Sequence, residues 1–428
     1  MDSWLTSAAA RRPALTALEG GDGTVTYAQL AERAARAALA LQAAGLHPGE
    51  RVALALADPV EFVVALHACL LLGAPAVPID LRLTREEQDV RASGAAAVLR
   101  ELPSVRPGAE PRATPAGPPA VAAVMHTSGA TAAPKPVRLT PANFLASATG
   151  SALALGLEQA ERWLCPMPLT HVGGLSIPVR SAIYATTAVL HPRFQTEAVL
   201  EELMDPGRHL TLVSLVPTML ARLLDAGLES PPTLRWALLG GGPIPEALLE
   251  RAARARVPVA PTYGMTEACS QIATFGWPLS GVELRLAGTE REVLVRGPIV
   301  SPDAPAADGW LHTGDLGAFD EQGRLRITGR RADTIITGGE NVAPAEVEAV
   351  LLEHPEVADA AVIGRPDPDW GEALVALVVT LGGQPVDAEA LREHCGSRLA
   401  PFKVPKTVER VDELPRTVSG KLLRRQLG

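Results

Sequence analysis

Apolar and polar residues along the first hundred positions follow a pattern that predicts a β-α-β unit. Residues 51–56 form a short apolar run, residues 59–72 an apolar run of helical length, and residues 76–79 a second short run. Asp58 is placed to cap the helix, and Gly73 is placed to end it. A strand, a helix and a further strand in this order are the building block of a parallel sheet.

An amphipathic helix is predicted upstream of this unit. Thr26 and Gln29 have the spacing of a capping box, and Gly45 can end the helix. Between them, apolar residues recur at helical spacing and mark one face. These residues are Leu30, Ala34, Ala37 and Leu41.

The alternation of short apolar runs and helical segments continues to about residue 260. Strands are expected at 120–125, 163–165, 188–190, 210–215, 236–239 and 257–260, and helices from 140, after Gly174 and at 196–204. Polar or glycine-rich turns follow three of these strands, at 125–137, 240–243 and 262–267. The pattern predicts an α/β fold with its ligand at the carboxyl ends of the strands, and we expect all three turns at one sheet edge.

The pattern changes after residue 280. Short strands separated by Gly, Pro and Asp at 281–327 predict a small antiparallel or β-barrel-like subdomain. Residues 329–333 are interpreted as a domain boundary. Beyond this boundary we expect helices at 344–352 and 388–398 and strands at 360–363 and 373–380. We therefore predict a large domain at 1–329 and a small, mobile α+β domain at 330–428. Residues 102–119, rich in Pro, Gly and Ala, are expected to form a surface connection.

Composition narrows the function classes. The chain has 428 residues and a formal net charge of −9, without a basic stripe, which argues against a nucleic-acid surface. The first twelve residues lack the features of a signal peptide, and the most apolar stretch is too short to span a bilayer. Four cysteines without CxxC spacing are best interpreted as reduced, buried thiols of a cytoplasmic protein rather than as a zinc site or disulfides.

Residues 125–137 carry the first candidate chemistry. They combine three hydroxyls, one glycine, three alanines and Lys135 directly after a predicted strand. Such a loop suits phosphate, because backbone amides can approach the oxygens closely while hydroxyls and a cation add to them. An ordinary turn of small residues is the alternative. Lysine is rare here, with Lys135, Lys403, Lys406 and Lys421 among 39 Lys and Arg, which favours a site that needs a compact ammonium group.

Six blocks in order resemble the adenylate-forming superfamily, which contains acyl-CoA synthetases, luciferases and peptide-synthetase adenylation domains. One block alone is weak evidence, whereas six in sequence over residues 120–428 are specific. The blocks are the loop with Lys135, PLTH at 168–171, GGGP at 240–243, YGMTE at 263–267, HTGD at 312–315 with GR at 329–330, and SGK at 419–421.

The resemblance implies a ligase that joins a carboxylate to ATP as an acyl-adenylate, releases pyrophosphate and passes the acyl group to a thiol. It implies that Thr127, Ser128, Gly129, Thr131 and Lys135 hold the β- and γ-phosphates, and that Gly241, Gly242 and Tyr263 line the adenine. Asp315 and Arg330 would take the ribose, Thr266 the α-phosphate and Glu267 the Mg²⁺ ion. The plainer alternatives are a helix-opening acid for Glu267 and a turn residue for Asp315.

The same resemblance gives the small domain two tasks. Lys421 is the expected catalytic cation, because positioned cations stabilise charge that develops on phosphate oxygens. A rotation of the small domain would then withdraw it and let Gly338, Gly339 and Glu340 shape the path of coenzyme A. The alternative for Lys421 is a frayed tail.

Four positions depart from the superfamily pattern. Ala130 and Ala132 replace residues that are usually Ser, Thr or Gly, and Pro136 lacks the N–H of the usual glycine. One phosphate contact is therefore lost, and weaker ATP affinity is expected. Ala332 stands where many members carry a hinge Asp or Lys.

Five further runs are informative within the superfamily, at 168–176, 180–181, 216–220, 239–243 and 263–271. On these runs the chain most resembles the o-succinylbenzoate–CoA ligases of menaquinone biosynthesis. That substrate carries a second carboxylate, so an apolar pocket with a few polar groups is expected. The candidates are His171, Ser176, Arg180 and Ser270, and His171 is also a candidate catalytic gate. A solvated Arg180, a capping Ser176 and a core His171 are the alternatives. A CoA ligase for another aryl or medium-chain acid, a carrier-loading enzyme and a silent nucleotide binder stay open, as does a homo-oligomer.

Overall fold

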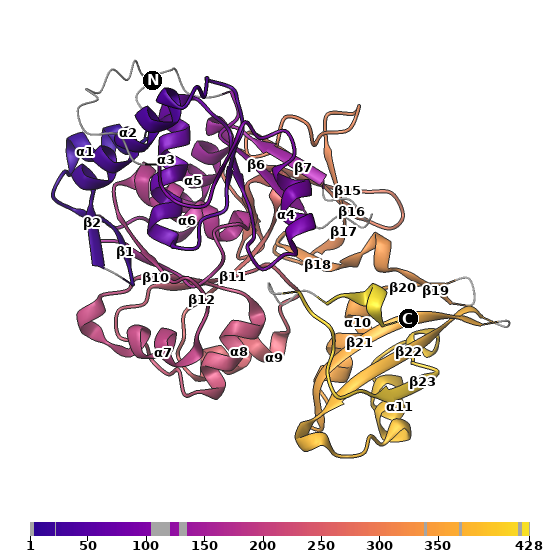
Figure 1. Ribbon diagram of the computed structural model, residues 1–428. Coiled ribbons are helices and arrows are strands. Elements are labelled where there is room, and N and C mark those ends of the chain that lie inside the picture. Colours follow the sequence, from indigo (N-terminus) through magenta and orange to yellow (C-terminus); the bar gives the residue numbers. More distant parts are fainter. Residues whose placement is uncertain are drawn as a thin grey trace.

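The computed structural model describes residues 4–21, 23–103, 120–127, 135–337, 340–367, 370–417 and 422–427. A large body holds three sheets and most of the helices, and a smaller body formed after β18 (Leu325–Arg330) lies to one side of it (Figure 1). The expected surface connection falls mostly at 104–119, outside the described residues. The division at 329/330 remains a prediction, although β18 ends at Arg330, beside it.

The central sheet has nine strands in the order β14-β13-β12-β11-β10-β8-β9-β1-β2. Its six inner strands, β12 to β1, are parallel, as the α/β alternation predicts. The strands are β1 (Thr16–Gly20), β2 (Gly23–Thr26), β8 (Arg162–Cys165), β9 (Thr187–Leu190), β10 (Leu212–Leu215), β11 (Trp236–Leu239), β12 (Val259–Met265), β13 (Ser270–Thr274) and β14 (Trp277–Pro278).

A second sheet contains the predicted β-α-β unit. Its order is β5-β3-β4-β6-β7, and β3 pairs with β4 in parallel, as predicted. Asp58 caps α3 through the backbone N–H of Glu61, and Gly73 ends the helix at a φ of 76°, so both predicted caps are confirmed. The elements are β3 (Val52–Leu54), α3 (Pro59–Leu72), β4 (Ala76–Pro78), α4 (Arg85–Ala92), β5 (Ala97–Leu99), β6 (Ala123–Thr127) and β7 (Lys135–Leu139).

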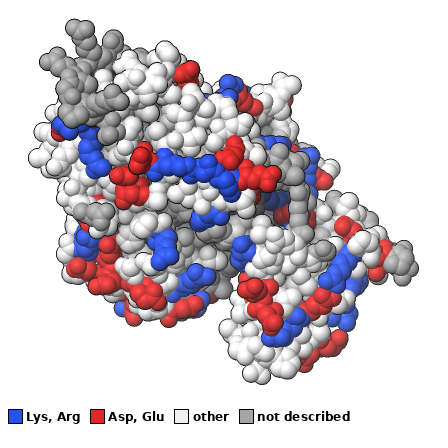
Figure 2. Space-filling view, in the orientation of Figure 1, with Lys and Arg blue, Asp and Glu red and all other residues white. Residues whose placement is uncertain are grey.

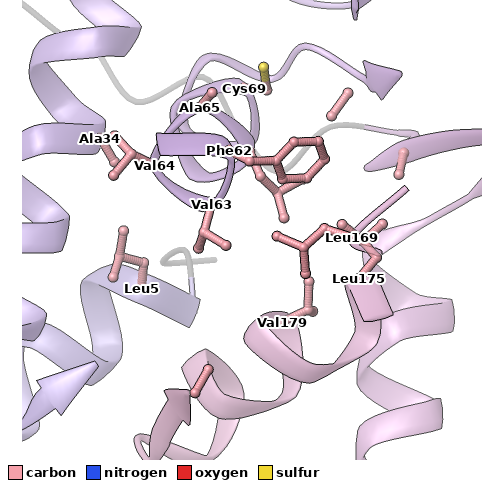
Figure 3. Packing of buried hydrophobic residues seen from close by; sticks show 14 of the residues in the cluster. Leu5, Ala34, Phe62, Val63, Val64, Ala65, Cys69, Leu169, Leu175 and Val179 are labelled. Atoms are coloured by element: carbon pink, nitrogen blue, oxygen red, sulfur yellow. The ribbon is translucent and has the colours of Figure 1, made fainter. Parts of the chain in front are cut away.

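Helices cover both faces of the central sheet. One core includes α2 and α3 and extends to α6, where Leu175 and Val179 point toward Phe62 of α3 (Figure 3). The other core lies under α7, α8 and α9. These helices are α1 (Trp4–Arg11), α2 (Tyr27–Ala43), α5 (Pro141–Leu155), α6 (Val172–Tyr184), α7 (Thr196–Met204), α8 (Pro217–Asp225) and α9 (Glu246–Arg254).

One helix starts earlier than the sequence suggested. The prediction placed its start after Gly174, whereas α6 begins at Val172 and includes that glycine. The reason is close packing, because a Cβ on Gly174 would lie 2.2 Å from the carbonyl oxygen of Pro168. The glycine therefore serves a tight contact and does not mark a helix boundary.

The small strands and the small body follow their predicted patterns. Residues 281–327 yield an open antiparallel sheet, β15-β16-β17-β18, so the antiparallel alternative holds. The small body packs α10 and α11 on a sheet of β20-β19-β22-β21 with β23. The elements are β15 (Glu283–Ala287), β16 (Glu292–Arg296), β17 (Leu311–Phe319), β19 (Ile335–Thr337), β20 (Glu340–Val342), α10 (Pro344–Leu352), β21 (Val357–Asp367), β22 (Gly371–Thr380), α11 (Ala388–Gly396) and β23 (Thr407–Arg410).

Two further sequence expectations concern cysteine and the membrane. Cys69, Cys165, Cys269 and Cys395 are all free and buried, as predicted. Within the described ranges, no helix is both long and apolar enough to cross a bilayer. On the face drawn in Figure 2, acidic and basic side chains are interspersed over the surface.

His67 makes the stability of the fold sensitive to acid. Its side chain is 2% exposed in α3 and its Nε2 has no hydrogen-bond partner among the described residues. Burial lowers the pKa of His67 to about 4. Below pH 6.5 His67 is protonated in the unfolded chain but stays neutral in the folded chain until the pH nears 4. The free energy of unfolding therefore falls as the pH drops from 6.5 to 4, by about 3 kcal/mol at most. The free energy of unfolding, measured with urea at several pH values between 6.5 and 4, should fall less steeply with decreasing pH in His67→Leu than in the wild type. The same pH dependence in both proteins would contradict this prediction.

Candidate active site

A tight hairpin presents Thr266 and Glu267. The sequence placed residues 262–267 in a turn after the strand, whereas β12 continues to Met265 and pairs with β13. The short helix Thr266–Ala268 (η2) forms the tip. Cys269 and Ser270 follow with φ values of 50° and 87°, which non-glycine residues adopt only under constraint. The two strands approach so closely that a Cβ on Gly264 would lie 1.7 Å from the carbonyl oxygen of Ser270.

Two side chains of α5 form hydrogen bonds to this hairpin and to the segment that packs beside it. Asn143 Nδ2 donates to the carbonyl oxygens of Pro298 (2.8 Å) and Val300 (2.9 Å), and the next residue, Ser301, donates its N–H to Glu267 O at 2.8 Å. One helical turn further, Ser147 Oγ donates to Cys269 O at 2.8 Å. Within the described part of the chain, no cation pairs with the Glu267 carboxylate, which leaves it available to a hard divalent ion.

The predicted ribose and adenine residues come together beside the hairpin. Tyr263 donates its hydroxyl to Asp315 Oδ2 at 2.8 Å, and Arg330 Nε lies 2.8 Å from Asp315 Oδ1. Burial, with the Asp315 carboxylate, raises the pKa of Tyr263, so the phenol stays protonated. Asp315 is a buried strand residue of β17, not a turn residue.

The glycines at 240–242 follow β11 directly. Gly240 touches β12, where a Cβ would lie 2.7 Å from Thr262 Cγ2, and Gly241 has a φ of 83°. A Cβ added to Gly242 would have a single near neighbour among the described residues, the Pro217 ring at 4.0 Å. The backbone can therefore pass close to a flat ligand at the carboxyl end of this strand.

The phosphate loop comes from the second sheet, which corrects one expectation. We expected it at the same sheet edge as the other two turns, but β6 belongs to β5-β3-β4-β6-β7, whereas β11 and β12 belong to the central sheet. Alternation of strands and helices does not reveal when a chain moves to another sheet. The two sheets still converge, because β7 packs beside η2. Thr127 pairs with the exposed Lys135 across β6 and β7, while Ser128, Gly129 and Thr131 lie outside the described residues.

Two candidate acid-binding residues share one face of α6. Ser176 and Arg180, four residues apart, are 1% and 2% exposed. Arg180 Nη2 donates to Ser147 Oγ at 3.0 Å, and its guanidinium lies 5.6 Å from the centre of the Trp163 ring. Arg180 Nε and Ser176 Oγ have no hydrogen-bond partner, and no carboxylate pairs with Arg180, in the described ranges. Burying a cation without a counter-ion costs free energy. We therefore expect the space around Arg180 to receive an anion when the ligand binds. The solvated alternative for Arg180 is wrong.

A proline keeps this helix in place without breaking it. Pro178 has no N–H for the Gly174 carbonyl, which instead lies 3.8 Å from the Cys165 thiol. Cys165 ends β8, so α6 is tied to the carboxyl end of a central strand.

His171 and Ser270 come from two different elements, since His171 directly precedes α6 and Ser270 begins β13. His171 has extended φ and ψ angles directly before α6, and its side chain reaches the surface, so the core-histidine alternative is wrong. The protein packed around its ring, with the charge of Arg82, lowers the pKa of His171, against the effect of Asp80. Asp80 and Arg82, which bond at 2.5 Å, were not singled out by sequence because nothing linked the segment after β4 to the 168–171 block.

The small body carries the remaining candidates. Glu340 begins β20, whereas Gly338, Gly339 and Lys421 lie outside the described residues. The segment after Lys421 is anchored, since Leu422 bridges to Arg416 and Arg424 pairs with both oxygens of Glu348 at 2.6 and 2.8 Å. A frayed tail is therefore not the arrangement of residues 422–427. Arg424 also lies 3.4 Å from Asp333, next to the hinge position Ala332.

Two of the four lysines have local partners. Lys403 contacts both oxygens of Glu346, at 2.6 and 2.7 Å, and Lys406 lies 4.0 Å from the centre of the Trp370 ring. Both contacts stay within the small body. The scarcity of lysine therefore does not by itself mark a site.

Asn143 and Ser147 are the residues that sequence reasoning missed. A signal was present for the first, because Thr140 and Asn143 have the spacing of a capping box, which the structure shows. Ser147 lies one turn later on the same face. Its partners are 33 and 122 positions away in the chain, so local spacing could not reveal them.

Most of the candidate site residues fall within the parts of the chain that match two protein-family models. Residues 5–103 and 93–301 match the family described as AMP-binding enzyme, and residues 346–421 match the AMP-binding enzyme C-terminal domain. The two matches together span most of the chain.

Individual relatives agree over the full length. A 2-succinylbenzoate–CoA ligase from Bacillus licheniformis is 42% identical, covering 99% of either chain. A crystal structure of o-succinylbenzoate coenzyme A synthetase from Bacillus subtilis with its acyl-adenylate intermediate has a TM-score of 0.90 and 37% identity, covering 100% of this chain and 98% of that one. A structure of the same Bacillus subtilis enzyme with ATP and a magnesium ion has a TM-score of 0.88 and 36% identity. The match covers 100% of this chain and 99% of that one.

Proposed function

Because the chain belongs to the AMP-binding enzyme family, we propose that it is an o-succinylbenzoate–CoA ligase. It activates the succinyl carboxylate with ATP as an acyl-adenylate, releases pyrophosphate and transfers the acyl group to coenzyme A. The full-length relatives of the same activity support this reaction. The buried guanidinium of Arg180, which pairs with no carboxylate among the described residues, carries the choice of acid, because a second carboxylate on the substrate supplies a counter-ion.

The described residues suit the first half-reaction. Thr266 begins η2, and we assign it the role of a donor to the α-phosphate. Mg²⁺, when bound, offsets phosphate charge, and the unpaired Glu267 carboxylate is the residue that would hold it. Asp315, oriented by Tyr263 and Arg330, has the acceptor oxygens that ribose hydroxyls need. Thr127 and Lys135 flank the loop assigned to the outer phosphates.

The acid would enter between α6 and the hairpin. Its ring carboxylate would pair with Arg180, and Ser176, four residues earlier on α6, and Ser270, at the start of β13, are the candidate hydroxyl donors. His171, which is exposed directly before α6, is the candidate gate. The small domain then supplies Lys421 for adenylation and, after rotation, the segment with Gly338, Gly339 and Glu340 for coenzyme A.

The redox state of the cysteines supports a proposal for where in the cell the enzyme works. Four free, buried thiols suit a reducing compartment, and we place the enzyme in the cytoplasm. A homo-oligomer remains open.

Acid-dependent ATP–pyrophosphate exchange tests the function. The panel holds o-succinylbenzoate, benzoate, a medium-chain fatty acid and 4-oxo-4-phenylbutanoate, which keeps the succinyl arm but lacks the ring carboxylate. We expect exchange with o-succinylbenzoate to be at least about tenfold more efficient than with any other acid, and a thioester to form when coenzyme A is added. Efficient exchange with the other acids but none with o-succinylbenzoate would overturn the assignment. Exchange without thioester formation would point to a carrier protein as the acceptor.

A further inference from the structure

A buried serine connects the acid pocket to the hairpin that carries Thr266 and Glu267. Ser147 is 1% exposed on α5, between α6 and β13. Its Oγ lies 3.0 Å from Arg180 Nη2 and 2.8 Å from the carbonyl oxygen of Cys269. No other described side chain is hydrogen-bonded to both parts of the candidate site.

The direction of both hydrogen bonds is determined by their partners. A guanidinium can only donate and a carbonyl oxygen can only accept. The single proton of the Ser147 hydroxyl therefore goes to Cys269, and its lone pair faces Arg180. With its proton committed, the hydroxyl cannot rotate without losing one of the two bonds. Such a chain of donors also polarises each bond in it.

The backbone at the far end of this chain has little freedom. Cys269 and Ser270 both have positive φ, and the Ser270 carbonyl rests against the Cα of Gly264. The hairpin therefore holds the Cys269 carbonyl at a set place, and that carbonyl sets the Ser147 hydroxyl. The hydroxyl in turn orients a guanidinium whose other described contact is the face of Trp163.

We infer that Ser147 is a positioning residue that holds Arg180 at a defined distance from the Thr266–Glu267 hairpin. It thereby sets the spacing between the carboxylate that is recognised and the carboxylate that reacts. This inference rests on the proposed function, because it assigns the Arg180 site to the second carboxylate of the substrate. Discrimination between a dicarboxylate and its monocarboxylate analogue is the property that Ser147 controls.

The test compares exchange with o-succinylbenzoate and with 4-oxo-4-phenylbutanoate, which differ only in the ring carboxylate. The ratio of kcat/KM for the two acids should fall about ten- to hundredfold in Ser147→Ala, chiefly through KM for o-succinylbenzoate. Ser147→Cys, of nearly the same size but weaker in hydrogen bonding, should fold normally and show an intermediate ratio. In the double variant with Arg180→Met, the ratio should equal that of Arg180→Met alone, because both changes remove the same interaction.

Ser151→Ala is the matched control. Ser151 is equally buried one turn further along α5 and, in the described structure, forms no hydrogen bond to Arg180 or Cys269, so the ratio should not change. A parallel loss for both acids in Ser147→Ala, with lowered thermal stability, would mean a purely structural role and overturn the inference. An unchanged ratio in Ser147→Ala and Ser147→Cys would do the same while leaving the function intact. If the wild-type enzyme gives no exchange with o-succinylbenzoate, the function itself fails.

Discussion

Lys421→Ala should abolish acid-dependent pyrophosphate release while leaving the transfer of a supplied acyl-adenylate to coenzyme A largely intact. In the proposed mechanism the ammonium group stabilises charge that develops on the α-phosphate, and loss of one such group typically lowers kcat about a hundred- to a thousandfold. In the proposed mechanism, thiolysis expels AMP from an acyl-adenylate that is already formed, after a rotation of the small domain. Burst and single-turnover measurements of each half-reaction separate the two effects.

The matched control is Lys403→Ala. Lys403 is a lysine of the same small domain that pairs with Glu346, and its loss should leave both half-reactions unchanged. Residues 422–427 are anchored to the small body through Arg416 and Glu348, so we expect this segment to move with the small domain. Equal loss of both half-reactions in Lys421→Ala would refute the separation of tasks.

Arg180→Met should reduce kcat/KM for o-succinylbenzoate by about a hundred- to a thousandfold and change that for 4-oxo-4-phenylbutanoate only severalfold. Removing one member of a buried, hydrogen-bonded charge pair costs about 2–5 kcal/mol, and each 1.4 kcal/mol is a factor of ten. The loss is expected mainly in KM, because the ring carboxylate is bound equally in the ground and transition states.

Arg180→Lys distinguishes charge from shape. Lysine keeps the charge but not the planar fork that reaches Ser147 and stacks on Trp163, so it should recover only part of the lost efficiency. Thermal unfolding should show that Arg180→Met is no less stable than the wild type, since it removes a buried cation without a described counter-ion. Equal losses for the two acids would show that Arg180 does not recognise the ring carboxylate.

Much of the fold could be predicted because its signals are local. The start and end of α3 follow from Asp58 and Gly73, and the parallel pairing of β3 with β4 follows from the helix between them. The candidate site followed from the order of six short blocks, and the structure places Tyr263, Asp315 and Arg330 in contact, 52 and 15 positions apart.

The remaining features depend on contacts that no local pattern encodes. The assignment of β6 to a different sheet from β11 depends on which strands find each other in three dimensions. The early start of α6 depends on the approach of Gly174 to Pro168, and the role of Ser147 on two distant partners. Residues of this kind, which hold other residues in place, leave almost no trace in sequence spacing.

The distribution of the buried thiols offers a way to observe the two domains separately. Cys69, Cys165 and Cys269 lie in the large body, whereas Cys395 lies in the core of the small one. A maleimide reagent can reach each of them only when the surrounding core opens transiently. Mass spectrometry of alkylated peptides would therefore time the breathing of each domain within one unmodified enzyme, and show how nucleotide slows it.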